Sequence, residues 1–367
     1  MRISTSANAH SLFPMQTVLK PTLRSLDFAP GWELDPVPLN LWASIWSPIV
    51  DLRVTHPRDE DGANYMLGID RGTLAGARYA TGYQLFQHPK RKLSSGAGLI
   101  AVQRVISGYT AMEFELKTFV HRPGFITITD HLHEFRGSDH RTVGEMILIP
   151  RHLLCLPDHS PIGPIMIPID SLYGETIASE MGHFFEPVSH DRSMDAFDED
   201  SLLHAIGAVI GHHRHPSSER AGWWRARNDL IRKYIDSHLG DQTLLPAQIC
   251  NLFNLSRATL YRMFEDDGGV RRFIQDRRLY SAIWDLAEGG TQRGRLTRVS
   301  EKWGFSSNAN FNRAVKAAFG MPPGALLSLS AYVRAARLDD TRGKDPLYDW
   351  FSKLGREDSF SQSIKPY

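Results

Sequence analysis

The chain has only two cysteines among its 367 residues, Cys155 and Cys250, and neither stands in a Cys-x-x-Cys pair. This scarcity excludes a disulfide framework and a zinc finger, and it is typical of a reducing compartment. No apolar run approaches the roughly 20 residues that a membrane-spanning helix needs. The N-terminus also lacks a basic segment followed by an apolar one. We therefore expect a cytoplasmic protein without a membrane partner.

The sequence also lacks the common motifs of catalysis. It contains no Gly-x-x-x-x-Gly-Lys loop, no Gly-x-Ser-x-Gly motif and no cysteine in the context of a nucleophile. The paired carboxylates Asp266 and Asp267 fall in a predicted turn. We therefore expect no catalytic residue and no cofactor.

The composition is that of an ordinary globular protein, with 42% hydrophobic and 23% charged residues, and the length allows two domains. The net charge of +1 conceals an asymmetry, because residues 221–325 carry a net charge of +6 and the remainder carries −5. A basic module attached to an acidic remainder indicates a polyanionic partner for one part of the chain.

The predicted secondary structure changes along the chain. Residues 1–194 contain short β-branched segments separated by Gly and Pro, which is typical of an antiparallel sandwich or small barrel. Residues 195–222 combine a helix with a polar linker, residues 223–330 are helical throughout, and residues 331–367 form a polar tail that we expect to be loose. Apolar residues at three- and four-residue spacing mark one face of the first helix: Leu202, Leu203, Ile206, Val209 and Ile210.

Residues 244–264 show the pattern of a helix-turn-helix. A short apolar helix has Pro246 in its first turn, where a missing N–H costs nothing. Asn254 follows where the chain must turn sharply, and Asn tolerates a positive φ. Ser256 can then cap a second helix over residues 257–264. Three residues of that helix point inward: Leu260, Met263 and Phe264.

The pattern recurs about 50 residues later in the chain. The equivalent pairs up to the turn are Ile249 and Val299, Cys250 and Ser300, Phe253 and Trp303, and Asn254 and Gly304. The pairs beyond the turn are Ser256 and Ser307, Leu260 and Phe311, and Arg262 and Arg313. Gly320 then ends the second helix, and Pro322 and Pro323 prevent it from resuming.

One long helix over residues 271–286 is predicted between the two patterns by an apolar stripe. A stiff connector can hold two recognition helices about one DNA turn apart (~34 Å), so that both enter successive major grooves on one face of the duplex. We interpret Arg277 and Arg278 in this helix as structural residues that face Asp or Glu neighbours.

These residues resemble the DNA-binding domain of the AraC/XylS transcription regulators. The resemblance covers about residues 228–329 and rests on "LYRMFEDDGGVRRFIQDRRLYSA" and "VSEKWGFSSNANFNRAVKAAFGMPP". It implies a regulator, often an activator, that binds double-stranded operator DNA as a homodimer and works with RNA polymerase. The sequence departs from the family at Cys250 and Ser300, where Ala is usual, and at Leu327, where Arg often follows the closing Pro.

The predicted DNA contacts lie on the outer faces of the two recognition helices. The resemblance implies Ala258, Tyr261, Arg262, Asn308, Ala309, Asn312 and Arg313, and the outer faces add Arg257, Thr259 and Asn310. Arg can bind guanine and Asn can bind adenine through paired hydrogen bonds. Two alternatives stay open: the arginines form salt bridges between helices, and the asparagines are only surface residues.

The N-terminal half resembles the cupin-like jelly-roll sensor domain of the same family, on residues 122–130 and the stretch "GEMILIPRHLL". The expected fold class is thus α+β multidomain, with a β-rich N-terminal sensor domain and an all-α double helix-turn-helix domain. The resemblance implies that the sensor domain binds a small effector or mediates dimerisation, with the 195–213 helix at the dimer contact. Three tryptophans either line an effector pocket or fill the core: Trp32, Trp42 and Trp46.

A competing hypothesis is a metal-dependent cupin enzyme fused to a DNA-binding module. His131 and His133 would face the same way if they lay on a strand, and a carboxylate could complete a metal site. Glu134 follows directly and would point away, and His121 and His140 could contribute only through the fold. The favoured interpretation of residues 130–134 is a loop at the mouth of the barrel. A third hypothesis is an N-terminal half that dimerises and senses nothing.

Overall fold

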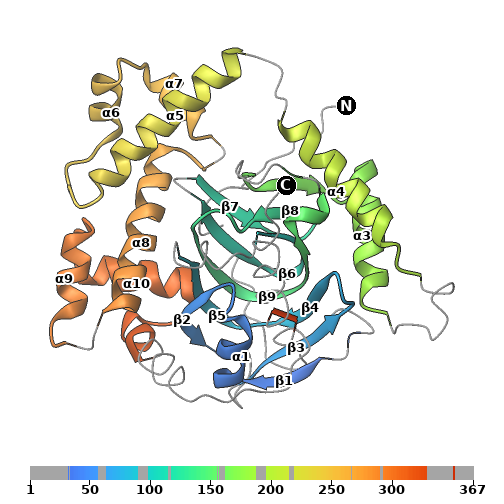
Figure 1. Cartoon of the computed structure of the whole chain (residues 1–367). Helices are drawn as coiled ribbons and strands as arrows, with labels where there is room; N and C mark the ends of the chain where they lie inside the picture. Colours follow the sequence, from blue (N-terminus) through green and yellow to red (C-terminus); the bar gives the residue numbers. More distant parts are fainter. Residues whose placement is uncertain are drawn as a thin grey trace, which may run out of the picture. The chain divides into compact units, whose positions relative to one another are not determined.

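The structure is a computed structural model in which two compact units can be distinguished. It describes residues 32, 34–56, 63–89, 98–114, 117–154, 156, 162–186, 196–214, 219–265, 267–289, 292–328 and 350–351. The helical unit comprises Ser217–Tyr332 together with Ala111–Val120, and the β-rich unit comprises Asp27–Thr110, His121–Pro216 and Val333–Tyr367. Figure 1 shows the elements of both.

The β-rich unit is built on an antiparallel sheet that has ten strands within the described residues. The strands are β1 (Asp35–Pro38), β2 (Asp51–His56), β3 (Ala63–Asp70), β4 (Ala75–Ala80), β5 (Tyr83–His88), β6 (Leu99–Phe114), β7 (Lys117–His121), β8 (Phe125–Asp130), β9 (Phe135–Pro150) and β10 (Ile165–Pro168). The main path runs β1-β3-β4-β9-β6-β8-β10, while β2 pairs with β5, β5 with β9, and β7 with β6. The predicted antiparallel β-rich domain is therefore confirmed.

The long strands β6 and β9 each take part in more than one pairing. The first part of β9 pairs with β5, with Tyr83 opposite His140, and the second part pairs with β4, with Ala80 opposite Val143. Arg141 lies between these two parts and has φ 50°, so the strand changes direction there. A bent strand that serves two sheet segments is consistent with the cupin-like arrangement.

The β-rich unit also holds helices, of which the sequence predicted only the last. They are α1 (Leu39–Trp46), η1 (Arg151–Leu154), α3 (Leu172–Phe184) and α4 (Glu199–Arg214). Ser171 caps α3 by accepting a hydrogen bond from the backbone N–H of Gly174. Trp42 and Trp46 of α1 are buried and stack edge to face, with ring centroids 5.7 Å apart. Their placement favours the core interpretation of these tryptophans.

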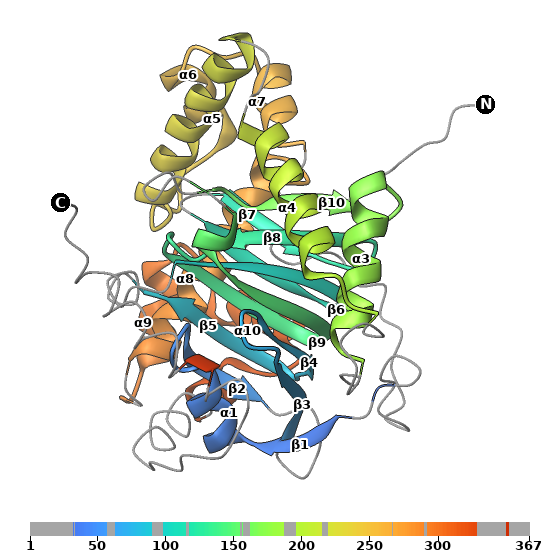
Figure 2. The same ribbon diagram turned by 45° about the vertical axis from the view of Figure 1, so that its right-hand side comes forward.

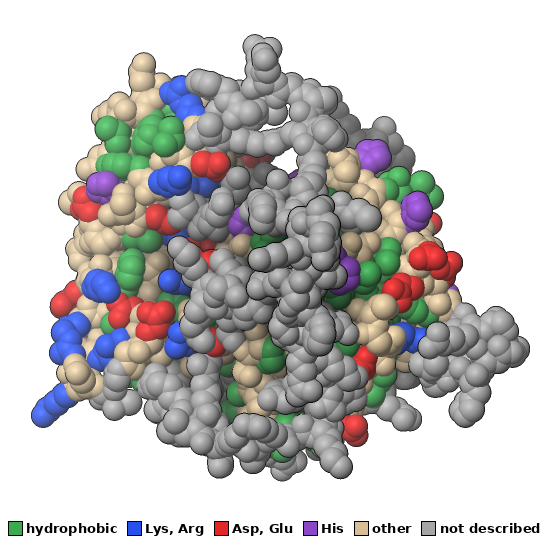
Figure 3. Space-filling model, viewed as in Figure 1, with side chains coloured by type: hydrophobic (Ala, Val, Ile, Leu, Met, Phe, Trp, Pro, Cys, Tyr) green, Lys and Arg blue, Asp and Glu red, His purple; other side chains and the backbone are tan. Residues whose placement is uncertain are grey.

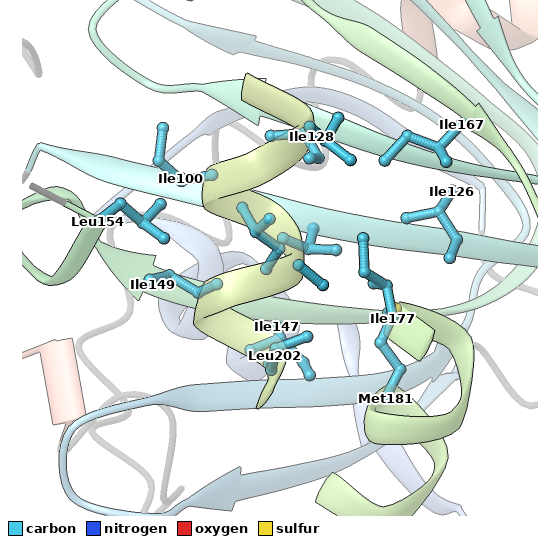
Figure 4. Close-up of a cluster of buried hydrophobic side chains, with 14 of the residues drawn as sticks. Ile100, Ile126, Ile128, Ile147, Ile149, Leu154, Ile167, Ile177, Met181 and Leu202 are labelled. Carbon is cyan, nitrogen blue, oxygen red and sulfur yellow. The ribbon is translucent and has the colours of Figure 1, made fainter. Parts of the chain in front are cut away.

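The predicted 195–213 helix corresponds to α4, and its apolar stripe is covered within its own unit. Leu202 and Ile206 are fully buried, in one cluster with Ile177 of α3 and with Ile100 and Ile147 of the sheet. Figure 2 shows α3 and α4 lying over one face of the sheet, and Figure 4 shows Leu202, Ile177, Ile100 and Ile147 gathered between these helices and the strands. This burial is the hydrophobic contribution that holds both helices on the sheet, and it leaves the apolar stripe unavailable to a second subunit.

The β3–β4 turn joins several parts of this unit. Arg71 donates hydrogen bonds to the carbonyl oxygens of Phe184 and His183 at the end of α3, where a cation is favourable. The Nε1 of Trp350 donates to the carbonyl oxygen of Gly72 at 3.0 Å, and Trp350 is buried. The expectation of a loose polar tail is therefore wrong at Trp350 and Phe351, because their aromatic rings bury apolar area. The rest of the 331–367 tail lies outside the described residues.

The helical unit contains α5 (Glu219–Ser237), α6 (Pro246–Leu252), α7 (Arg257–Met263), α8 (Val270–Glu288), α9 (Arg295–Lys302) and α10 (Asn308–Phe319). The predicted connector is α8, and its apolar stripe is buried at Ile274, Leu279, Ala282, Ile283 and Leu286. Gly320 ends α10 with φ 68°, as its position predicted.

Candidate DNA interface

The first helix-turn-helix consists of α6, a tight turn and α7. Pro246 stands in the first turn of α6, where it was expected. Asn254 has φ 47° and thus takes the left-handed conformation that the turn requires. Ser256 accepts a hydrogen bond from the backbone N–H of Thr259 at 3.1 Å and begins α7. Helix α7 ends at Met263, one residue before the predicted end, and Leu260 and Phe264 are fully buried.

The second helix-turn-helix consists of α9, a tight turn and α10. Gly304 has φ 72° at the position equivalent to Asn254. Ser307 accepts a hydrogen bond from the backbone N–H of Asn310 at 3.2 Å, which is the same cap as that of Ser256. Phe311 and Val315 form the buried side of α10.

The backbone hydrogen bonds of the two turns are equivalent. The N–H of Leu255 donates to the carbonyl oxygen of Cys250 at 2.9 Å, and the N–H of Phe305 donates to that of Ser300 at 2.9 Å. The carbonyl oxygens that accept are 50 residues apart, as the predicted repeat requires. The structure therefore places two copies of one turn geometry in the same unit.

The outer face of α7 presents most of the residues predicted for it. Arg257, Ala258, Tyr261 and Arg262 are exposed, and Thr259 is half-buried. Tyr261 is 41% exposed, and this is high for a large aromatic ring. The exposed part of this ring is accessible to a partner.

The outer face of α10 presents all five predicted residues, which are exposed: Asn308, Ala309, Asn310, Asn312 and Arg313. Their side chains are not equally available. The amide of Asn308 accepts from the Ser300 hydroxyl at 2.5 Å and donates to the Thr297 hydroxyl at 2.9 Å, and both partners lie on α9. Asn310 donates to Ser306 at 2.6 Å. Arg313 donates to the amide oxygen of Asn310, which orients its guanidinium.

Arg277 and Arg278 on α8 are buried and serve the structure of the unit. Arg277 pairs with Asp236 of α5 through two hydrogen bonds of 2.8 Å. Arg278 instead donates to two backbone carbonyl oxygens, those of Leu239 at 2.9 Å and Asp241 at 2.6 Å. The structural interpretation is correct for both, although the partners of Arg278 are carbonyl oxygens rather than carboxylates.

Further basic residues, which the sequence analysis missed, lie at the start of α9. Arg293 and Arg298 are exposed, and Arg298 donates to the carbonyl oxygen of Arg293 at 3.2 Å. Basic side chains appear over α9 in the space-filling view of Figure 3. The signal in the sequence was the close spacing of Arg293, Arg295 and Arg298 just before the second turn. In helix-turn-helix proteins the first helix crosses the DNA backbone.

The interior of the β-rich unit contains a buried polar network. Gln103 donates to the Tyr79 hydroxyl, and the amide oxygen of Gln103 lies 2.8 Å from Nδ1 of His121. Burial lowers the pKa of His121 to about 4, so the ring is neutral at pH 7. The Nε2 atom of His121 and the hydroxyl of Thr129 are buried and have no hydrogen-bond partner among the described residues.

A second part of the network surrounds Asp139. The carboxylate accepts from Gln84 at 2.5 Å and from Thr110 at 2.6 Å, and Gln84 in turn accepts from the Trp42 indole at 3.0 Å. Burial raises the pKa of Asp139 to about 6, although its hydrogen bonds act in the opposite direction. A carboxylate only accepts hydrogen bonds, whereas a carboxylic acid also donates one, so protonation of Asp139 would change its hydrogen bonds with Gln84 and Thr110.

The residues of the metal hypothesis are arranged differently from a metal site. Residues 131–134 form a turn, not a strand. Asp130 accepts hydrogen bonds from Arg151 and from the backbone N–H of Ile162. Its carboxylate is therefore already occupied by hydrogen bonds within the fold. The ring of His131 packs beside His88, with centroids 5.2 Å apart. Within the described part of the chain, no group of three His, Cys, Asp or Glu side chains is placed to hold a metal ion.

Comparisons with known proteins match the helical unit to a recognised domain. Residues 249–329 match the family described as a helix-turn-helix domain. The chain is similar to the AraC-like transcriptional activator CuxR (20% identity, 68% of this chain and 95% of that one, TM-score 0.41). It is also similar to the apo form of a ToxT variant from Vibrio cholerae (12% identity, 71% and 98%, TM-score 0.31).

The C-terminal domain of the response regulator yesN from Fusobacterium nucleatum is a third similar structure (20% identity, 27% of this chain and 95% of that one, TM-score 0.24). The family match and the two equivalent turns define the class: a DNA-binding transcription regulator. Residues 249–329 form a helix-turn-helix domain of the AraC type, as the motifs predicted.

None of the described helices is both long and apolar enough to cross a membrane.

Proposed function

We propose that the protein is a sequence-specific regulator that reads two adjacent major-groove segments, one with α7 and one with α10. The observation that carries this proposal is the duplication of the turn geometry at Asn254 and Gly304 on either side of one helix. The exposed residues of each recognition helix then contact DNA, with base contacts from those whose side chains are not bonded to α9, and Arg293 and Arg298 supply phosphate contacts. We place this activity in the cytoplasm, with a homodimer and RNA polymerase as partners.

The test is a selection of DNA ligands from a random-sequence duplex library with the purified full chain at two salt concentrations. We expect a motif of two boxes about one helical turn apart. Arg313→Ala should relax the base preference at one position of one box, whereas Arg136→Ala, which removes an exposed arginine of the β-rich unit, should keep the preferences of both boxes. Binding that depends on salt but shows no sequence preference would contradict the proposal.

We further propose that the β-rich unit binds a small polar effector. Support comes from Nε2 of His121 and the hydroxyl of Thr129, which have no partner among the described residues. A buried polar atom without a hydrogen bond costs free energy, so a ligand that pairs with it gains affinity. The nitrogen Nδ1 of His121 faces the amide oxygen of Gln103 and carries the proton, so Nε2 is an acceptor that suits a hydroxyl or N–H donor.

A thermal-shift screen of small hydroxylated and amine-bearing compounds tests the effector proposal, because a ligand that binds only the folded state raises the melting temperature. A true effector should lose its shift in Thr129→Val, which keeps the shape of the side chain. If no compound shifts the melting temperature, the hypothesis of a unit that only dimerises gains support. Metal analysis of tag-free protein tests the cupin-enzyme alternative independently.

A further inference from the structure

The second turn lies directly against the loop that follows α5. A Cβ atom on Gly304 would lie 2.8 Å from the carbonyl oxygen of Leu239 and 3.0 Å from Nε of Arg278. A Cβ atom on Gly240 would lie 2.7 Å from the carbonyl oxygen of Lys302. Two backbones approach this closely only where both sides carry glycine. The loop after α5 and the turn of the second helix-turn-helix are therefore in direct contact.

The loop side of this contact packs with the first helix-turn-helix, and the other side is the turn of the second. Leu239 is part of the buried core of the first, together with Ile249, Leu260 and Phe264. Gly304 is the turn residue of the second, and its neighbour Trp303 packs against the same core. The loop after α5 thus connects the core of one DNA-reading element to the turn of the other.

Arg278 of α8 lies beside this contact and binds the loop after α5. Its guanidinium donates to the carbonyl oxygens of Leu239 and Asp241, at 2.9 and 2.6 Å, and the residue is only 5% exposed. A guanidinium is suited to this position because its planar fork reaches two acceptors at once, which an ammonium group on a flexible chain does not do in one fixed geometry. The side chain also forms one wall of the space beside Gly304.

We propose that Arg278 is a positioning residue that fixes the distance and rotation between the two recognition helices. The inference rests on the proposed two-box binding. With Arg278 in place, the second helix-turn-helix cannot turn about the end of α8, so α7 and α10 meet the duplex in one relative orientation. Without it, the loop and the second turn lose their common anchor, and the relative orientation becomes variable.

The spacing of the two boxes provides a readout that a general loss of stability would not change. One inserted base pair moves the second box by about 3.4 Å and rotates it by roughly 35°. A rigid protein must then give up contacts in one box, whereas a flexible one follows the displaced box. The variant should therefore bind its best site less tightly and discriminate less between spacings.

The experiment uses the full chain and the two-box duplex selected by the wild type, with the boxes at native spacing and with one base pair added or removed. We expect the wild type to lose about tenfold or more in affinity when a base pair is added, and Arg278→Met to lose less than about threefold. Arg278→Lys, which keeps the charge, should be intermediate. Arg271→Met, which removes an exposed arginine of the same helix, should keep the wild-type penalty.

Two results would overturn the inference, and they differ in what else they overturn. If the wild type selects two boxes but Arg278→Met and Arg278→Lys, folded by circular dichroism, keep the full insertion penalty, only the role of Arg278 is wrong. If the wild type selects one box or none, the proposed two-box function is wrong as well.

Discussion

The outward-facing side chains of the two helix-turn-helices occupy equivalent positions, 51 residues apart, so they can be compared pair by pair. The pairs are Arg257 and Asn308, Ala258 and Ala309, Thr259 and Asn310, Tyr261 and Asn312, and Arg262 and Arg313. The alanine and the last arginine are the same in both. The other positions carry amides in the second helix and a cation, a hydroxyl and a phenol in the first.

The difference extends to how each recognition helix is held. Helix α10 runs for 12 residues and is bonded at its first residue to α9, through Asn308 with Ser300 and Thr297. Helix α7 runs for seven residues, and its first residue is an exposed arginine. A longer and better anchored helix with amide side chains suits selective base recognition. We therefore expect the second element to contribute more of the specificity than the first.

The two turns should respond very differently to alanine. Gly304→Ala places a side chain at φ 72° and only 2.8 Å from the carbonyl oxygen of Leu239, so we expect a loss of roughly 2–4 kcal/mol in the free energy of unfolding. Asn254 already carries a Cβ atom, so Asn254→Ala loses only the tolerance of Asn for a positive φ and should cost about 1 kcal/mol. Denaturant unfolding of both variants measures the difference. Equal losses would mean that the second turn has more room than its geometry indicates.

Removal of the equivalent arginines compares the two DNA contacts directly. Arg313→Ala should weaken specific DNA binding by roughly 1–3 kcal/mol and relax the preference at one base pair, because the guanidinium can pair with guanine. Arg262→Ala should have a smaller effect. The exposed face of α7 carries no amide side chain that could recognise bases beside Arg262, so we expect this helix to contribute less specificity. Titration of the selected duplex measures both affinities. If Arg313→Ala, with its fold intact, binds as well as the wild type, the assignment of this residue is wrong.

The asparagines of α10 should separate into two kinds. Asn312 is exposed, and its side chain has no intramolecular hydrogen bond within the described residues, so Asn312→Ala should alter the base preference and cost about 1–2 kcal/mol. The amide of Asn308 is occupied by Ser300 and Thr297, so Asn308→Ala should weaken binding by a smaller amount and leave the base preferences unchanged. Repeating the library selection with each variant distinguishes the two. A changed base preference in Asn308→Ala would restore its predicted role as a base contact.

The DNA-binding half was predictable from sequence because its turns admit few residue types. Asn254 and Gly304 are among the few residues that accept a positive φ, and Ser256 and Ser307 are strong helix caps. These local requirements are visible in the sequence at fixed spacing. The bonds of Asn308 were not visible, because they depend on how α9 and α10 cross. The only hint was Ser300, a hydroxyl where Ala is usual in the resembling family.

The β-rich half was less predictable because its contacts join distant segments. Helix α1 begins after Pro38 without a side-chain cap, so no local signal marked it within a strand-rich region. Trp350 finds its acceptor, the carbonyl oxygen of Gly72, 278 residues away in the sequence. Short apolar segments of this kind are ambiguous until the tertiary fold decides their state. The predicted helix over 195–213 succeeded because its stripe was long and regular.

The smallest expected effect tests the anchoring of α10 by a double-mutant cycle. Ser300→Ala and Asn308→Ala remove the two ends of one hydrogen bond, so their effects on the free energy of unfolding should not add, with a coupling of about 0.5–1 kcal/mol. Cys250 and Arg257 stand at the equivalent positions of the first element, where one is a buried thiol and the other an exposed arginine. The matched cycle, Cys250→Ala with Arg257→Ala, should therefore show no coupling. Additive effects in both cycles would show that the two recognition helices are held equally, and the asymmetry between the elements would then reside only in their exposed side chains.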